Sequence, residues 1–134
     1  MNIPTTNPNA EVLLRASEKP WVEFGPGIDF KTLRTSSETG VWTVLFRCAK
    51  GSAFPAHRHY GAGEYLMIKG RMDYRMGVAE AGDYGYEPLG ALHELTSFVE
   101  DSELLFTNHG PVVFLDEDGG TKMILDHQFF ADRA

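Results

Sequence analysis

The stretch GSAFPAHRHYGAGEYLMIKG, residues 51–70, places two histidines one residue apart and a glutamate five positions later. In extended backbone, residues i and i+2 point to the same face, so His57 and His59 would present their imidazole rings side by side. Neutral imidazoles are good ligands for zinc, iron, nickel and copper. Glu64 follows the segment YGAG, which can fold its carboxylate back toward the same point. The stretch therefore has two interpretations, a metal site or a polar surface turn.

A second stretch, GDYGYEPLGALHELT at residues 82–96, favours the metal site. His93 comes just after the turn residues Pro88 and Gly90 and opens an apolar segment. A barrel can bring this histidine opposite the first pair and complete a set of three ligands. Three protein ligands leave coordination positions open, as in catalytic metal sites.

The rest of the chain consists of short apolar runs separated by glycine, proline and other turn residues, which is typical of an all-β sandwich or barrel. Strands are expected at residues 21–24, 29–35, 41–49, 56–59, 65–69, 71–76, 83–87, 92–96, 103–108, 111–116 and 121–125. A short C-terminal helix is expected within residues 126–134, with Asp126 as its cap. Residues 1–10 contain two prolines and three asparagines and are expected to form a flexible arm before one domain at residues 11–134.

Composition limits the partners. A chain of 134 residues with 43% hydrophobic residues can form one domain with its own core. A net charge of -7 argues against nucleic acid or an anionic membrane as the partner. Neither a membrane helix nor a signal peptide is visible in the sequence. The single cysteine, Cys48, has no partner for an internal disulfide, so a cytoplasmic location is expected.

These two stretches resemble the two motifs of the cupin family. The spacing from Gly51 through the histidine pair to Glu64 is similar to the first motif, and the run from Gly82 to His93 is similar to the second. The resemblance implies a single-domain double-stranded β-helix, or jelly-roll barrel, with a metal held inside. It also implies a homodimer, which the exposed sheet edges of such barrels favour.

The sequence HRHYGAGEYLMIKGRMDYR, residues 57–75, is similar to acetylacetone-cleaving (β-diketone) dioxygenases and to 2,4'-dihydroxyacetophenone dioxygenase-like cupins. ChrR-like cupins, which include a zinc-binding regulatory module, are similar over the same stretch. The resemblance implies His57, His59 and His93 as metal ligands. It implies that polar residues surround the metal pocket, at positions that correspond to Arg75, Glu87, Tyr65 and Thr96. It also implies one aromatic residue at the access gate of the pocket, and this residue corresponds to Phe54.

The sequence departs from the general cupin pattern at two points. Five residues separate Glu64 from Gly70, where the usual first motif has six. A slip of one residue turns a strand side chain to the other face, so Glu64 either binds the metal or lies beside it. The asparagine often found four positions after the second-motif histidine is Ser97 here. Arg75 and Glu87 also have a simpler interpretation as a structural ion pair.

The function expected from this resemblance is a non-haem Fe(II) dioxygenase that uses dioxygen to cleave a C–C bond in a small dicarbonyl or aryl ketone. Fe(II) is the expected functional ion, while a purified sample could carry Zn or Ni. Two alternatives stay open: a zinc-binding sensor without turnover, and a metal-dependent isomerase or hydrolase of a small metabolite. The fold does not separate them, because one fold hosts many chemistries.

Overall fold

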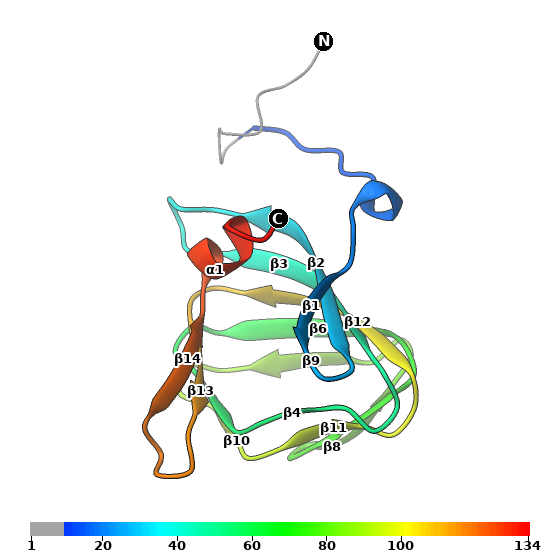
Figure 1. Cartoon of the computed structure of the whole chain (residues 1–134), viewed down its shortest axis with the longest axis vertical. Coiled ribbons are helices and arrows are strands. Elements are labelled where there is room, and N and C mark those ends of the chain that lie inside the picture. Colours follow the sequence, from blue (N-terminus) through cyan, green and yellow to red (C-terminus); the bar gives the residue numbers. More distant parts are fainter. Residues whose placement is uncertain (1–9) are drawn as a thin grey trace.

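The computed structural model describes residues 10–134, so nearly all of the predicted N-terminal arm lies outside the described residues. The described part is almost entirely β structure (Figure 1). Its strands are β1 (Val22–Gly25), β2 (Ile28–Thr35), β3 (Trp42–Cys48), β4 (Ala53–Phe54), β5 (His57–His59), β6 (Gly63–Lys69), β7 (Arg71–Tyr74), β8 (Gly77–Glu80), β9 (Tyr84–Glu87), β10 (Leu92–His93), β11 (Thr96–Phe98), β12 (Ser102–Asn108), β13 (Val112–Leu115) and β14 (Thr121–Leu125). A 3-10 turn, η1 (Ala16–Glu18), precedes them and a helix, α1 (His127–Ala131), follows.

The strands form three antiparallel sheets around one core. The largest has the order β1-β2-β3-β12-β6-β9, and the two smaller sheets have the orders β10-β5-β13-β14 and β4-β11-β7-β8. Figure 1 shows β3, β12, β6 and β9 stacked across the middle of the molecule, with β4, β10 and β11 near one end. Strands distant in the sequence pair repeatedly, as in jelly-roll barrels. The predicted all-β barrel is confirmed.

The core is rich in aromatic side chains, because alternate residues of each strand point inward. On β3, Trp42 and Phe46 are both buried. The helix α1 completes the core at one end, where the Phe130 ring stacks on Trp42 with a centroid distance of 4.5 Å. The Asp126 carboxylate accepts a hydrogen bond from the backbone N–H of Phe129 at 2.8 Å, so the predicted helix and its cap are confirmed.

Several strand boundaries differ from the sequence prediction, most of all in β4, β8, β10 and β11. The strand expected at 71–76 ends at Tyr74, and a tight turn follows it. The next strand, β8, lies in a segment that the sequence analysis did not predict to be a strand. The segment GVAE in β8 has only Ala79 buried, so it lacks an apolar alternation that would identify a strand. The strand expected at 92–96 divides into β10 and β11, and the two-residue strand β4 lies in a stretch expected to be a loop. Such short strands are defined by pairing rather than by local sequence.

No helix in the described part of the chain is long and apolar enough to cross a membrane.

Candidate metal centre

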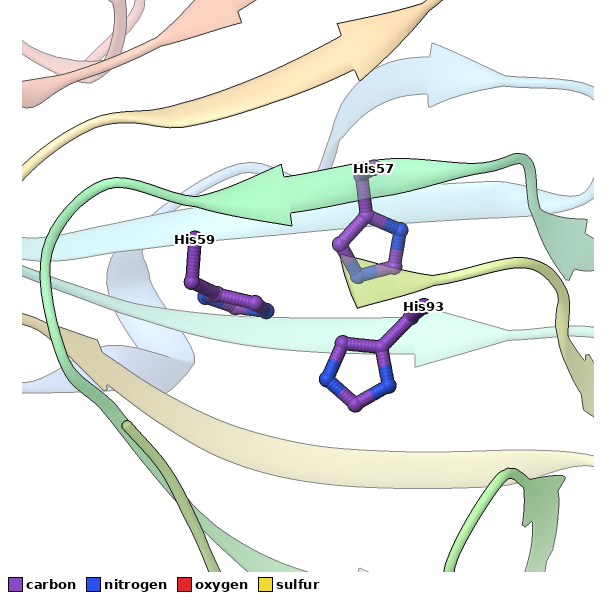
Figure 2. A group of neighbouring side chains, drawn as sticks. All are labelled: His57, His59 and His93. Atoms are coloured by element: carbon purple, nitrogen blue, oxygen red, sulfur yellow. The ribbon is translucent and has the colours of Figure 1, made fainter. Parts of the chain in front are cut away.

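Two short strands bring the three predicted histidines together. His57 and His59 lie on β5 with Arg58 between them, and both imidazoles point into the barrel and are buried. The strand β10 pairs with β5 in antiparallel register, which places His93 opposite His57. The candidate donor atoms of the three side chains all lie within 4.8 Å of one another (Figure 2).

The three rings form a nearly symmetric group. Their centroids are 5.2 Å apart for His57 and His59, 5.1 Å for His57 and His93, and 5.2 Å for His59 and His93. The Nε2 atoms of His59 and His93 are buried and make no hydrogen bond with the described residues. Buried polar atoms without a partner cost free energy, and converging imidazole nitrogens are the donor set that a transition-metal ion satisfies. The residues present therefore fit a metal ion.

Burial prepares the imidazoles to act as ligands. The pKa of His57 is lowered from 6.5 to about 4, chiefly by burial, and the neighbouring histidines add to the effect. Burial also lowers the pKa of His93. The Nδ1–H of His57 donates to the carbonyl of Pro55 at 2.8 Å, which fixes the tautomer and leaves Nε2 free to bind a metal. At neutral pH both rings are therefore neutral, with a lone pair available.

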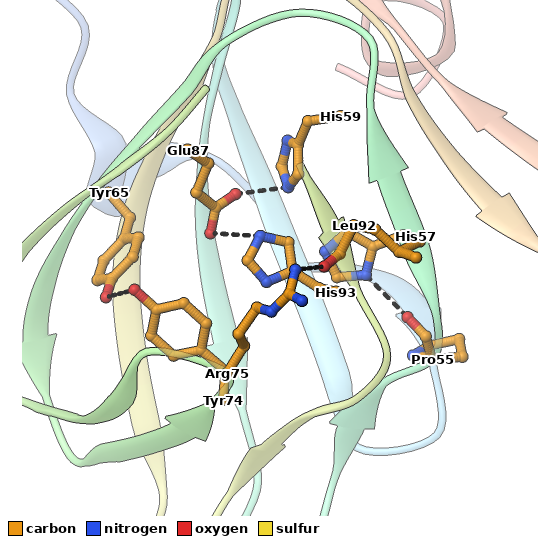
Figure 3. Close-up of polar contacts among 9 residues, drawn as sticks. All are labelled: Pro55, His57, His59, Tyr65, Tyr74, Arg75, Glu87, Leu92 and His93. Carbon is orange, nitrogen blue, oxygen red and sulfur yellow. Dashed lines mark hydrogen bonds and ion pairs between the residues drawn. The ribbon is translucent and has the colours of Figure 1, made fainter. Parts of the chain in front are cut away.

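A buried carboxylate adjoins the three histidines. Glu87, on β9, places Oε2 2.5 Å from Nε2 of His59 and Oε1 3.5 Å from Nε2 of His93 (Figure 3). The closer contact has the distance of an ion pair, and its two atoms have no other hydrogen-bond partner among the described residues. Burial acts to raise the pKa of Glu87, but the contact with His59 and the other histidines outweigh it, and the pKa is lowered. Glu87 is therefore an anion beside the position that a metal would occupy.

Comparison with known proteins agrees with this geometry. Residues 9–113 match the family model of the ChrR cupin-like domain. The chain belongs to this cupin family. It is 39% identical over 121 residues to the acetylacetone-cleaving enzyme of Acinetobacter johnsonii, covering 82% of this chain and 79% of that protein.

Two solved structures match closely in three dimensions. The crystal structure of an acetylacetone dioxygenase from Acinetobacter johnsonii has a TM-score of 0.86 and 34% identity, covering 99% of this chain and 96% of that chain. The crystal structure of a candidate acetylacetone dioxygenase from Methylibium petroleiphilum also has a TM-score of 0.86, with 36% identity over 92% of this chain and 93% of that chain. The cupin fold is thus established along almost the whole described chain.

The cupin barrel does not bring Glu64 to the three histidines. On β6 the inward positions are Gly63 and Tyr65, so Glu64 points outward and its side chain is 43% exposed. Its Oε1 lies 3.9 Å from Nε2 of His109, which is also exposed. The inward residue paired with Glu87 is Gly63, not Glu64. The sequence led us to expect Glu64 at the metal or beside it, whereas strand alternation turns it to the outer face, since one residue of slip exchanges the two faces.

Tyr65 points into the barrel and is paired with a residue that sequence reasoning missed. Its hydroxyl lies 2.6 Å from the hydroxyl of Tyr74 on β7, and the Tyr74 ring lies 5.5 Å from the His93 ring. Burial raises the pKa of both phenols, so they stay protonated and can donate hydrogen bonds. Tyr74 could have been found from strand alternation, because it follows the buried Met72 by two residues on β7.

Arg75 approaches the same region from the turn between β7 and β8. Its Nη1 donates to the carbonyl of Leu92 at 3.0 Å, the residue before His93 (Figure 3). Its positive charge contributes to the lowered pKa of His93, after burial. No ion pair joins Arg75 to Glu87 within residues 10–134, so the structural ion pair considered from the sequence is not formed.

Phe54 and Thr96 lie side by side on paired strands. They are register partners between β4 and β11, and both are buried. The Phe54 ring meets the edge of His57 at a centroid distance of 6.4 Å, and Phe114 lies closer to His57, at 5.1 Å. Phe54 is therefore part of an aromatic wall beside the three histidines. The contribution of Phe114 gave no signal in the sequence, because it depends on the pairing of β13 with β5.

Proposed function

We propose that this cupin is a mononuclear metal-dependent dioxygenase that cleaves a C–C bond in a small β-dicarbonyl or aryl ketone. The observation that carries the proposal is the buried group of His57, His59 and His93 with Glu87 against it. The 39% identity to an acetylacetone-cleaving enzyme supports the reaction class. Dioxygen and a small ketone are the proposed reactants.

Fe(II) is the proposed ion, held by His57, His59 and His93. Bound iron would supply the one-electron chemistry that dioxygen requires, which zinc lacks. Zinc binds nitrogen ligands more tightly than ferrous iron, so zinc in a purified sample is compatible with an iron enzyme. Three neutral imidazole ligands contribute no charge, and the one negative charge of Glu87 beside them offsets only part of the charge of a divalent ion, which favours an anionic, chelating substrate such as an enolate.

The chain's own residues have separate roles around this centre. Glu87 maintains a negative charge beside the ring nitrogens of His59 and His93 that would face the ion. The paired hydroxyls of Tyr65 and Tyr74 provide a protonated donor for a substrate oxygen. Arg75 supplies a positive charge that attracts an anionic substrate and balances its charge.

The aromatic wall limits the access of water. The wall comprises Phe54, Phe114 and Phe106, whose rings pack against His57 or His59. An apolar lining strengthens electrostatic interactions in the site and protects reactive species from water. Thr96 lies behind Phe54 on β11, where it would position this wall rather than meet the substrate.

A regulatory metal-binding module without turnover is the second candidate. The match to the ChrR cupin-like family model favours it, because ChrR-like cupins include a zinc-binding regulatory module. Such a module would bind a metal and a small ligand with the same residues but convert nothing.

A homodimer is also proposed. The outer face of the largest sheet exposes four large apolar side chains on adjacent strands: Leu66 and Ile68 on β6, and Tyr84 and Tyr86 on β9. Contiguous apolar patches on a protein surface commonly mark interaction sites. A second copy of this chain, related by a two-fold axis, would cover the patch with its own equivalent.

The test compares metal forms of one preparation. The protein is stripped of metal and reloaded anaerobically with Fe(II) or Zn(II), and oxygen uptake is followed with a panel of β-diketones and hydroxyacetophenones. Uptake is expected with at least one compound in the iron form, and not in the zinc form or in His57→Ala. His109→Ala is the matched control, because it removes an exposed histidine outside the centre. An iron form that consumes no oxygen with any compound would contradict the proposed reaction, and a saturable ligand left unconverted would favour the regulatory module.

A further inference from the structure

One row of inward-facing residues crosses the largest sheet at the level of the metal centre. Trp42 pairs with Asn108, Asn108 pairs with Gly63, and Gly63 pairs with Glu87. The glycine carries no side chain, so no side chain of β6 separates Asn108 from Glu87 in this row. A Cβ atom at Gly63 would lie 2.7 Å from Oδ1 of Asn108. The Asn108 carboxamide therefore leans over Gly63, toward the strand that carries Glu87.

The Asn108 side chain is fully buried and unsatisfied. Its exposed fraction is 0%, and neither Oδ1 nor Nδ2 has a hydrogen-bond partner among the described residues. A buried carboxamide without partners destabilises the fold, so such a group needs a physical explanation. A bound water is the usual one where several polar atoms meet in the interior.

A second unsatisfied donor lies in the same region. His59 turns its Nε2 atom toward Glu87. Its other ring nitrogen, Nδ1, is buried and has no hydrogen-bond partner among the described residues. The His59 ring stacks on Phe106 at a centroid distance of 6.1 Å. Phe106 and Asn108 are two residues apart on β12 and face the same way. Phe106 links the two groups, because the His59 ring stacks on it and Asn108 lies two residues further along the same inward face, with no direct hydrogen bond between His59 and Asn108.

We propose that Asn108 positions the His59 ligand through one buried water, which accepts from Nδ1–H of His59 and donates to Oδ1 of Asn108. A metal-binding histidine almost always donates its second N–H to a carbonyl, carboxylate or water, and this contact fixes the tautomer and ring orientation. His57 has such a partner in Pro55, and the water would give His59 the equivalent. The inference rests on the proposed metal centre but not on the proposed reaction.

Zinc affinity and fold stability are measured separately to test it. Chelator competition gives the zinc affinity, and thermal unfolding of the metal-free protein gives the stability. Asn108→Leu removes the acceptor, Asn108→Asp retains an acceptor oxygen, and Gly63→Ala displaces the carboxamide. Thr32→Val is the matched control, because Thr32 is buried on β2 and its hydroxyl donates to Phe130 instead.

Asn108→Leu is expected to weaken zinc binding about 10–100-fold, the range usual for residues that orient a ligand. Its metal-free unfolding temperature should equal or exceed that of the wild type, because an apolar replacement removes an unsatisfied amide. Asn108→Asp should retain the wild-type zinc affinity within a few-fold. Gly63→Ala should lose zinc affinity to the same extent as Asn108→Leu. Thr32→Val should lower the unfolding temperature and leave the zinc affinity unchanged. An Asn108→Leu protein that binds zinc as the wild type does would overturn the proposal.

Nuclear magnetic resonance of ¹⁵N-histidine-labelled, zinc-loaded wild-type protein tests the contact without any substitution. The proposal predicts Nε2 of His59 on the zinc and a slowly exchanging Nδ1–H with a cross-peak to bound water. A His59 ring bound through Nδ1, or an Nδ1–H that exchanges freely, would overturn it. Unchanged zinc affinity in His59→Ala would count against the metal centre itself and remove the basis of the inference.

Discussion

His93 lies directly opposite His57 in the antiparallel pairing of β10 with β5. Each of these strands is too short to be stable alone, so the position of the ligands depends on the barrel around them. The two motifs are 34 residues apart when counted from His59 to His93, yet they meet in one ladder. We therefore expect the barrel to form without the metal.

Substitution of His93 should remove metal without unfolding the protein. His93→Ala deletes one of three donors, so bound metal in a purified sample should fall by at least 10-fold, while the aromatic core remains intact. Elemental analysis measures the metal, and far-ultraviolet circular dichroism measures the fold. His109→Ala should keep both at the wild-type level. A folded His93→Ala protein with full metal occupancy would remove His93 from the centre.

Substitutions of Glu87 and Glu64 should differ sharply in their effect on metal affinity. Glu87→Gln removes the buried charge that contacts His59 and His93, and metal affinity should fall about 10–100-fold. Glu64→Gln alters an outward-facing side chain beside His109, and affinity should change less than about two-fold. The same chelator competition measures both variants. A larger effect of Glu64→Gln would show that the outward position of Glu64 is not the one that binds metal.

The metal-free protein should lose stability as the pH falls from about 6.5 to about 4. His57 takes up a proton below 6.5 in the unfolded chain but only near 4 in the folded chain. The unfolded state therefore binds more protons in this window, which costs stability on the order of 2–3 kcal/mol for this one group. The lowered pKa of Glu87 acts with the same sign at its lower end. Chemical denaturation at a series of pH values measures the slope, and His57→Phe should flatten it.

The apolar patch on β6 and β9 should control the oligomeric state. Leu66→Lys places a charge within the apolar patch, so the proposed dimer should dissociate. Sedimentation velocity measures the change in mass. Met76→Lys is the control, because Met76 is also an exposed apolar residue, 79% against 42% for Leu66, but lies in the turn between β7 and β8. A wild-type protein that sediments as a monomer at all concentrations would refute the dimer.

The sequence contained enough information for the three histidines and for the barrel. The i, i+2 spacing of His57 and His59 is a local property of a strand, and short apolar runs between turn residues indicate β structure. The position of Glu87 against His59 was not a local property. It depends on the register between β6 and β9, which places Gly63 and not Glu64 beside it.

Other features of the site arise only from packing. Phe114 reaches His57 because β13 pairs with β5. Asn108 lies next to Gly63 because β12 lies between β3 and β6. Neither pairing has a signature in the neighbouring residues. The strand β8 was not predicted because its residues are mostly exposed and show no alternation of apolar and polar side chains.

Isotope incorporation during turnover tests the central claim most directly. The iron-loaded protein is given a cleavable diketone under ¹⁸O₂ in ordinary water, and the two carbon fragments are trapped quickly and analysed by mass spectrometry. A dioxygenase breaks the C–C bond and transfers both oxygen atoms, so the account predicts one ¹⁸O atom in each fragment. Fragments that form without ¹⁸O would mean that water supplies the oxygen, as in a hydrolase, and would contradict the account.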